Sequence, residues 1–506
     1  GFAMGDVTVE RAAPPSAGFA RWLADVRAQL TRQLQQGIGG RSGGIAAALV
    51  TGDRGGIDLE VTEAMRDSGL AHLIAISGLH FAVVVGGTLW LVRRLLTLWP
   101  WFALRYDARI TAAAFAALAG VAYMLIAGAS VPSVRACIAV LIVLIGLATG
   151  REAISLRLVA VGATAILIWR PDYLLSPSFQ LSFAAVTGIV ALYQSAWGRK
   201  WSAPDRKRGW PARAGRSIAA LVMTGLVAEM TIGPIALFHF NQMGIYGVGA
   251  NLIAIPLTSF VIIPLLLLAV LTEPLGLSGP VHDALGYAIE QLINLAEVTA
   301  SLPGAVSTAP AMPVSAITLM VVGGLWICIW QTRRRWAGGG AVLAGVVIAL
   351  TAPHPDIFVD PSGRHVAVVT DDGIAMLRPR VGDYITDMWS GAAGVRQNIQ
   401  IEGSGNASCS RDSCRLDVIR NGRRWRIFAT RSKDLIGRGE MEPVCRDADI
   451  VVSDRNLPDW CRPRWLLLNR SELQRLGAVS IDLDRAMLRS SAAEDGEHPW
   501  ARGALR

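Results

Sequence analysis

The stretch LAHLIAISGLHFAVVVG, Leu70 to Gly86, opens the first long apolar run of this chain. A helix that crosses a bilayer needs about 20 mostly apolar residues, because the hydrocarbon core is about 30 Å thick and a helix rises about 1.5 Å per residue. Over all 506 residues the mean hydropathy is +0.41 and only 17% of residues are charged, which is too apolar for an ordinary soluble protein. The sequence therefore predicts a polytopic α-helical membrane protein.

We predict that residues 70–352 form the membrane domain, with eight or nine membrane segments. The apolar runs are 70–92, 110–128, 132–149, 156–170, 178–198, 216–238, 246–272, 313–331 and 337–352. Lys and Arg cluster in four of the connections, and such clusters normally lie in the cytoplasm. This rule places both ends of the chain outside. Successive connections then alternate between the two sides of the membrane only if the proline-interrupted run 246–272 is not a single crossing. We therefore predict a re-entrant or broken helix pair there.

Several segments, before, after and within the predicted membrane domain, have the composition of chain that lies outside the membrane. Residues 1–10 alternate apolar and polar side chains and predict a remnant strand of a missing N-terminal domain. Residues 16–69 predict an external amphipathic helix followed by two short helices around a Gly-rich turn. Residues 283–302 predict another amphipathic helix, on the outer face. Short strand patterns in residues 353–506 predict a soluble α/β domain.

Four of the six cysteines fall in this last region: Cys409, Cys414, Cys445 and Cys461. Their C-x4-C and C-x15-C spacing fits two disulfides better than a zinc ribbon, whose paired cysteines usually lie two to four residues apart. Disulfides require an oxidising compartment. The cysteines thus place this domain outside, in agreement with the Lys and Arg clusters, and leave their pairing open.

Polar side chains inside the apolar runs form the candidate site, because such residues are costly in a membrane and mark pathways by default. The residues we select as lining or gating a hydrophilic path are His72, Ser77, His80, Arg135, Gln180, Asn241 and Asn251. The alternative for each residue is a packing role between helices.

The sequence gives less support to two other functions for Ser77 and the histidines, a metal site and a serine hydrolase. On one continuous helix, His72 and His80 would be rotated by about 80° and separated by about 12 Å, unlike the i, i+4 pair that grips a metal. A serine hydrolase would use Ser77 with His80 or the distant His239 as base, but AISGL lacks the G-x-S-x-G elbow. We therefore predict no metal and no cofactor, and keep the intramembrane serine hydrolase as the alternative function.

Several long segments, in the right order over about residues 40–350, resemble the ComEC family of bacterial competence proteins. They are LVTGDRGGI (49–57), AMRDSGLAHLIAISGLHFAVVVG (64–86), AGASVPSVRACIAV (127–140), RPDYLLSPSFQLSFAAVTGIVAL (170–192) and FNQMGIYGVGANLIAIPLTSFVIIP (240–264). The resemblance implies a channel that passes single-stranded DNA across the bacterial inner membrane during natural transformation, with the N-terminal segment and the C-terminal domain in the periplasm. It also implies periplasmic DNA-receptor proteins as partners, and a homo-oligomer is a further arrangement we consider.

Two features depart from the family pattern. Most of the usual N-terminal OB-fold domain is missing, with at most residues 1–10 remaining. The C-terminal region resembles a degenerate metallo-β-lactamase-like domain, but its His354, His365 and His498 do not form the His-x-His-x-Asp-His metal cluster. We therefore expect a channel and not an enzyme. The sequence also lacks the G-x-x-x-x-G-K-[ST] pattern, so we expect a cytoplasmic ATP-driven translocase as partner.

Overall fold

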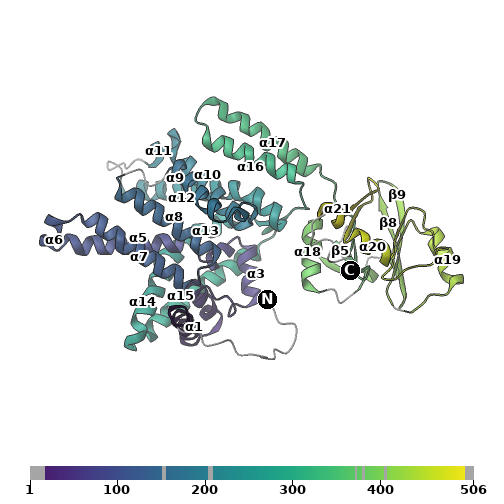
Figure 1. Cartoon of the computed structure of the whole chain (residues 1–506), viewed down its shortest axis with the longest axis horizontal. Coiled ribbons are helices and arrows are strands. Elements are labelled where there is room, and N and C mark those ends of the chain that lie inside the picture. Colours follow the sequence, from purple (N-terminus) through teal and green to yellow (C-terminus); the bar gives the residue numbers. More distant parts are fainter. Residues whose placement is uncertain are drawn as a thin grey trace. The chain divides into compact units, whose positions relative to one another are not determined.

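The computed structural model describes residues 18–150, 155–202, 209–370, 373–378, 382–403, 407–432 and 434–495. The predicted strand at residues 1–10 lies outside these ranges. The chain divides into two units, each described by itself below. The first takes in the described residues up to Gly233, with Met243–Ser307 and Cys328–Arg335. The second takes in Pro234–Gln242, Thr308–Ile327 and the chain from Trp336 (Figure 1).

Four helices of the first unit contribute to one core, which also takes in residues of the runs 70–74 and 250–269. They are α1 (Phe19–Ile38), α2 (Gly40–Thr51), α3 (Leu59–Asp67) and α15 (Gly279–Ala300). Leu285, Ile289 and Leu292 of α15 are fully buried in this core with Ile45 of α2 and Met65 of α3. Helices thus form in both predicted amphipathic segments, and α15 buries its apolar face against protein, while the external position of these segments stays a prediction.

The first apolar run is not one helix, so the predicted span 70–92 is wrong at its beginning. A short helix α4 (Ala71–Ile74) is followed by an extended turn, and α5 (Gly78–Thr97) begins afresh with Ser77 as its N-cap. Because Ser77 has extended dihedral angles, His72 and His80 do not lie on one helix. The 80° rotation calculated for a continuous helix does not apply.

Among the described residues, seven further helices lie between Pro100 and Phe240. They are α6 (Pro100–Arg105), α7 (Ala108–Ile126), α8 (Val131–Ala148), α9 (Leu156–Trp169), α10 (Pro177–Gln194), α11 (Ala196–Ser202) and α12 (Trp210–Phe240), with the 3-10 turn η1 (Pro171–Leu175) before α10. Among the described residues, five helices are long and apolar enough to cross a membrane: α5, α7, α8, α12 and the helical run Gly247–Leu275. The protein is a membrane protein, and the number and direction of its crossings stay predictions.

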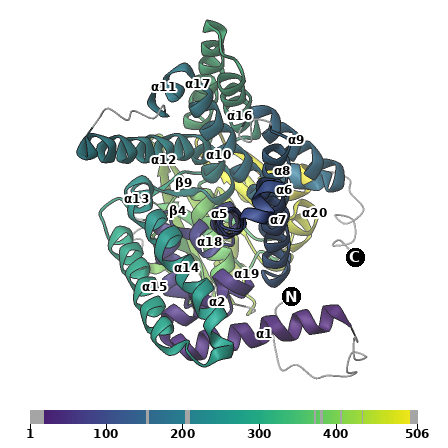
Figure 2. The same ribbon diagram turned by 90° about the vertical axis from the view of Figure 1, so that its left-hand side faces the viewer.

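The proline-containing run 246–272 is helical throughout, so the predicted interruption is wrong. Helix α13 (Gly247–Leu257) passes through a π turn, η2 (Thr258–Ile262), into α14 (Ile263–Thr272). Pro264 lies in the first turn of α14, where a missing N–H costs least. Pro256 lies near the end of α13, two residues before the π turn, and such turns frequently mark functional positions. Figure 2 shows α13, α14 and α15 side by side.

The last two apolar runs form shorter helices than predicted, α16 (Val314–Ile329) and α17 (Ala337–Leu350). They pack through glycines, since a Cβ added at Gly323 would lie 2.5 Å from the carbonyl oxygen of Gly338. Such close backbone approach is typical of membrane helix pairs.

From Ile357 onward the second unit forms a domain of two stacked sheets. One has the strand order β13-β12-β3-β4-β5-β6 and the other β11-β10-β9-β8-β7. The strands are β3 (Ile357–Val359), β4 (Val366–Thr370), β5 (Gly373–Met376), β6 (Asn398–Gln400), β7 (Ala407–Cys409), β8 (Ser413–Arg420), β9 (Arg423–Thr430), β10 (Ile450–Val452), β11 (Leu466–Leu468), β12 (Val479–Asp482) and β13 (Met487–Ser490).

Helices complete a four-layer α/β/β/α sandwich in this domain. The core between the sheets contains Val368 from one and Trp425 from the other, both buried. Helix α18 (Asp383–Ala393) covers the outer face of the first sheet through Trp389, which stacks on Phe358 at 5.9 Å between ring centroids. Helix α19 (Arg438–Asp447) covers the second sheet. The predicted α/β domain is confirmed.

Both predicted disulfides are present, and the structure supplies the pairing left open by the sequence. Cys409 pairs with Cys414 across β7 and β8, and Cys445 pairs with Cys461 beneath α19. The second pair closes a loop with a sequence separation of 16, against 5 for the first.

Loss of the longer disulfide loop should destabilise the soluble domain more than loss of the shorter one. Cys445→Ala with Cys461→Ala should lower its free energy of unfolding by about 3 kcal/mol, because the unfolded chain regains loop entropy. Thermal unfolding of the detergent-solubilised chain would measure this. The Cys409→Ala, Cys414→Ala pair is the matched control, and an equal loss in both double variants would contradict the loop argument.

Candidate functional site

Ser77 and His80 form a cap at the beginning of α5. The backbone N–H of Ser77 donates to His80 Nδ1 at 3.2 Å, and the Ser77 hydroxyl lies 3.0 Å from the same nitrogen. The Ser77 side chain in turn accepts from the backbone of His80, which completes a capping box with histidine in place of the usual glutamate. Because Nδ1 accepts, the ring proton lies on Nε2. That nitrogen is buried and has no hydrogen-bond partner among the described residues.

His72 has a different environment from His80. Its side chain is exposed, and its Nδ1 lies 3.2 Å from the carbonyl oxygen of Gly69. His72 therefore contacts the turn that precedes α4, while His80 is buried and holds the first turn of α5.

Arg135 is the most unusual charged group in the first unit. It lies near the beginning of α8, is 7% exposed, and donates from Nη2 to the Ser178 hydroxyl at 2.6 Å. Its Nε and Nη1 are buried and make no hydrogen bond in the part of the chain that the structure describes. Tyr173 of η1 lies close enough to interact with it electrostatically. A buried guanidinium without a counter-charge is strongly unfavourable, so this position is suited to an anion.

Gln180 and Asn241 are held by backbone groups. The Gln180 side chain donates to the carbonyl oxygen of Leu174 at 3.0 Å. Asn241, in the second unit, adopts a positive φ of 56° and donates to the carbonyl oxygen of Ala309 at 3.3 Å. Among the predicted residues, Ser77 and His80 thus contact each other directly, while Arg135 meets Ser178, two positions before Gln180.

Asn251 belongs to a polar stripe on the π-containing helix. Its Oδ1, the Thr258 hydroxyl and the Ser259 hydroxyl are all buried without a hydrogen-bond partner among the described residues. Spacings of seven and eight residues place Thr258 and Ser259 close to the face of Asn251 in a helix. The turn η2 packs against α5 and α15, so this stripe faces protein.

Glu229 of α12 was missed from the sequence, although a single carboxylate in an apolar span is the signal that could have identified it. It accepts the backbone N–H of Val248 and so caps the beginning of α13. A Cβ at Gly247 would lie 2.7 Å from Glu229 Oε1, and one at Gly69 would lie 3.1 Å from the Cα of Gly247. The glycines therefore bring α12, α13 and the turn before α4 together.

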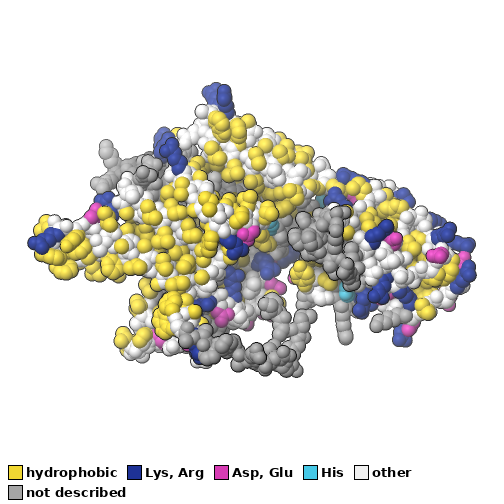
Figure 3. All heavy atoms as spheres, in the orientation of Figure 1, with side chains coloured by type: hydrophobic (Ala, Val, Ile, Leu, Met, Phe, Trp, Pro, Cys, Tyr) yellow, Lys and Arg dark blue, Asp and Glu magenta, His cyan; other side chains and the backbone are white. Residues whose placement is uncertain are grey.

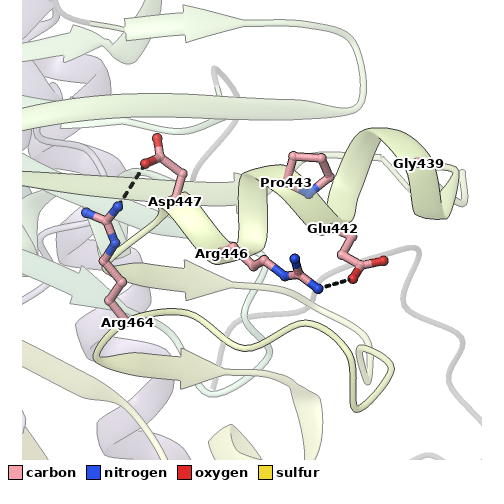
Figure 4. A pocket seen from close by; sticks show the side chains of 6 residues that line it. All are labelled: Gly439, Glu442, Pro443, Arg446, Asp447 and Arg464. Atoms are coloured by element: carbon pink, nitrogen blue, oxygen red, sulfur yellow. Dashed lines mark hydrogen bonds and ion pairs between the residues drawn. The ribbon is translucent and has the colours of Figure 1, made fainter.

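A shallow pocket of about 440 Å³ on α19 offers little for chemistry (Figure 4). Its charged side chains neutralise one another, since Arg446 pairs with Glu442 and Arg464 pairs with Asp447. Arg438, and also Arg446, hold the pKa of the Glu442 carboxyl below its usual value. The described residues contain no group of three His, Cys, Asp or Glu side chains arranged to hold a metal ion.

Apolar side chains cover much of the surface of the helical unit, whereas charged side chains are interspersed over the sandwich domain (Figure 3). Large exposed apolar residues occur along α5, α7, α9 and α14, including Trp90, Leu118, Ile168 and Leu271. An exposed apolar surface of this kind is what a lipid-facing bundle requires.

Comparison with known proteins now identifies the family. A family model described as "Competence protein" matches residues 49–334, which include α3 to α16 and every candidate site residue. The chain belongs to this family. The resemblance to competence proteins is therefore confirmed.

Curated relatives include "Recombination protein 2" of Haemophilus influenzae, 28% identical over 314 residues, which are 62% of this chain and 38% of the relative. "Competence protein ComA" of Neisseria gonorrhoeae is 28% identical over 323 residues, covering 62% of this chain and 43% of the relative. "ComE operon protein 3" of Bacillus subtilis is 28% identical over 227 residues, covering 44% and 26%. The chain thus spans less than half the length of these relatives. No solved structure matches it.

Proposed function

We propose that this competence-family protein carries single-stranded DNA across the bacterial cytoplasmic membrane as a channel during natural transformation. Phosphates in hydrocarbon would be prohibitively costly, so such a path needs polar and cationic groups at membrane depth. Arg135 is the observation that carries the proposal, because its buried Nε and Nη1 have no partner in the described chain and can bind a phosphate. His72, Ser77, His80, Gln180, Asn241 and Asn251 are the further residues proposed to line or gate this path.

We also propose the orientation of the channel in the membrane and the partners it works with. The N-terminal segment and the C-terminal domain face the periplasm, where the two disulfides can form. A cytoplasmic ATP-driven translocase supplies the energy, and periplasmic receptors deliver the strand. The α/β/β/α domain is a degenerate relative of the metallo-β-lactamase fold, supported by its two stacked sheets with a helix on each outer face.

A deletion strain complemented with this chain tests the proposal. Radiolabelled donor DNA should become resistant to external nuclease only when the chain is present, while DNA bound at the cell surface should be unaffected. Equal protection of DNA in the presence and absence of the chain would refute a transport role.

The alternative, a serine hydrolase, is favoured by the 3.0 Å contact of Ser77 with His80 and is tested by Ser77→Ala. As an N-cap, Ser77 contributes about 1 kcal/mol, so Ser77→Ala should keep DNA uptake within about threefold of wild type. A catalytic serine would instead be required for about 1,000-fold of the rate or more. Ser77→Asn, which keeps a capping side chain, is the control. Loss of uptake in both variants with normal protein levels would favour the hydrolase.

A further inference from the structure

The sandwich domain carries a group of arginines at one edge, including Arg378, whose Nε and Nη2 make no hydrogen bond among the described residues. The parallel strands β9 and β10 end there, at Thr430 and Val452, and Arg431 and Asp454 follow one and two residues later. Strand β5 of the other sheet ends there too, because Arg378 Nη2 lies 3.5 Å from Asp454 Oδ2. Ligands commonly bind beyond the carboxyl ends of parallel strands, where backbone and side chains from several strands converge.

Arg378 is the central residue of this edge. Its side chain is 18% exposed, and neither Nε nor Nη2 makes a hydrogen bond among the described residues. These two nitrogens form the side of a guanidinium that grips an oxyanion with two parallel bonds. Arg170 shows that use in this chain, with Nε and Nη2 donating to the two oxygens of Asp172 at 3.0 and 2.9 Å. In Arg378 the same side is buried and makes no hydrogen bond with the described chain, and the Asp454 carboxylate lies 3.5 Å from Nη2.

His365 directly precedes β4 and Arg378 follows β5 by two residues, so extending the β4–β5 register by two positions would bring them opposite each other. The backbone N–H of Leu377 donates to the carbonyl oxygen of Val366, which continues the β4–β5 ladder to this point. Residues opposite each other on antiparallel strands have Cβ atoms about 5 Å apart. The buried Nδ1 of His365 also lacks a hydrogen-bond partner among the described residues. Two neighbouring side chains therefore have unused polar atoms at the same edge.

The carboxylates near Arg378 are partly occupied by other groups. Asp360 accepts from the Ser362 hydroxyl at 2.6 Å and from the backbone N–H of His365 at 3.0 Å. Glu402 pairs with Arg431. Asp454 approaches Arg378 at ion-pair distance and without a hydrogen bond.

Two further cations act on Arg378. Burial lowers the pKa of Arg378, and the nearby Arg364 and Arg431 lower it further, while Asp454 and Asp360 raise it. The surroundings therefore contain three arginines, Arg364, Arg378 and Arg431, which we call the arginine cluster. The carboxylates of Asp360, Asp454 and Glu402 lie among these arginines, and an added oxyanion would weaken the remaining repulsion between the cations.

We propose that the arginine cluster, with His365, binds a phosphate group. Arg378 supplies the two-pronged contact through Nε and Nη2, His365 adds a contact through Nδ1, and Arg364 and Arg431 supply charge. The phosphate belongs either to a nucleic-acid strand or to free inorganic phosphate. The strand source rests on the proposed transport function, whereas phosphate binding itself does not.

Calorimetric titration of the purified full chain in detergent with inorganic phosphate tests the proposal. Arg378→Gln should weaken the Kd at least about tenfold, because two charge-assisted hydrogen bonds are lost. Arg378→Lys should recover only part of the affinity, since lysine lacks the fork. Asp454→Asn should tighten binding by removing a repelling charge. Arg475→Gln, on the exposed helix α20 (Arg470–Leu476), is the charge-matched control and should bind as wild type.

A structural ion pair between Arg378 and Asp454 predicts different results. It predicts a lower melting temperature for Arg378→Gln and Asp454→Asn in phosphate-free buffer, with no binding to lose. If Arg378→Gln does not fold, the exposed Arg364→Gln should still weaken the Kd about threefold through charge alone. Absence of phosphate binding by the wild-type chain, or equal Kd values in wild type, Arg378→Gln and Arg364→Gln, would overturn the site.

A competition experiment distinguishes the two sources of the phosphate, a nucleic-acid strand and free inorganic phosphate. Displacement of bound phosphate by a single-stranded oligonucleotide would assign the site to the strand, and its absence would assign the site to inorganic phosphate. A chain that fails to support transformation but binds phosphate through Arg378 would refute the transport proposal and leave this site intact.

Discussion

Arg135→Ala should reduce DNA uptake by about 100-fold or more in a complemented deletion strain. The wild-type side chain presents two buried nitrogens that lack acceptors among the described residues. Hydrogen bonds between charged groups contribute about 1.5–3 kcal/mol each, so two such contacts to a passing phosphate account for a reduction of this size. Arg135→Lys keeps the charge and should retain most of the uptake. Nuclease-protected DNA per cell is the measurement.

Arg135→Met separates a transport role from a structural one. A buried charge without a partner destabilises its surroundings, so an apolar side chain of similar length should keep or raise the melting temperature of the membrane domain. Uptake should nevertheless be lost. Arg157→Met, in the first turn of α9 with an exposed side chain, is the matched control and should transport normally. A stable Arg135→Met protein with full uptake would remove Arg135 from the path.

The membrane character and the helices of the N-terminal segment could be predicted because each depends on local composition. Strands β8 and β9 and the presence of two disulfides were predictable for the same reason. Hydropathy could not find the break before α5, because a serine and a glycine hardly change the average over a window. The capping box also escaped notice, since His80 stands where the usual pattern has glutamate or glutamine.

Contacts between distant segments account for most of what was missed. The sequence indicated that Arg135 lies in a span, but only the fold shows that Ser178 is its partner and that two nitrogens have none. Glu229 acquires its role from the beginning of α13, which the sequence does not place beside it. The prolines at 256 and 264 led to the prediction of a break in the helix. The structure instead has a π turn there, and the packing of η2 against α5 and α15, which surrounds this turn, cannot be read from the sequence.

Glycines in the N-terminal helices show a similar dependence on distant contacts. Gly44 lies in α2 and is fully surrounded by protein. A Cβ added there would lie 1.9 Å from the carbonyl oxygen of Gly56 and 2.5 Å from its carbonyl carbon. Gly56 is itself restricted, because a Cβ there would lie 2.4 Å from Gln35 Nε2. The Gly-rich turn in LVTGDRGGI is therefore held against α2 by backbone contact, which no side chain can relieve by changing rotamer.

Gly44→Ala should consequently prevent the first unit from folding normally. The added methyl group meets backbone and forces α2 away from the turn, at a cost of about 3 kcal/mol or more. The amount of chain in the membrane fraction and its elution on size-exclusion chromatography in detergent measure the effect. Gly86→Ala is the same change in α5, where a Cβ meets nothing within 4 Å, and it should accumulate as wild type. Equal accumulation and equal melting temperatures for both variants would mean that α2 does not contact this turn, and the glycine-rich segment would then need another explanation.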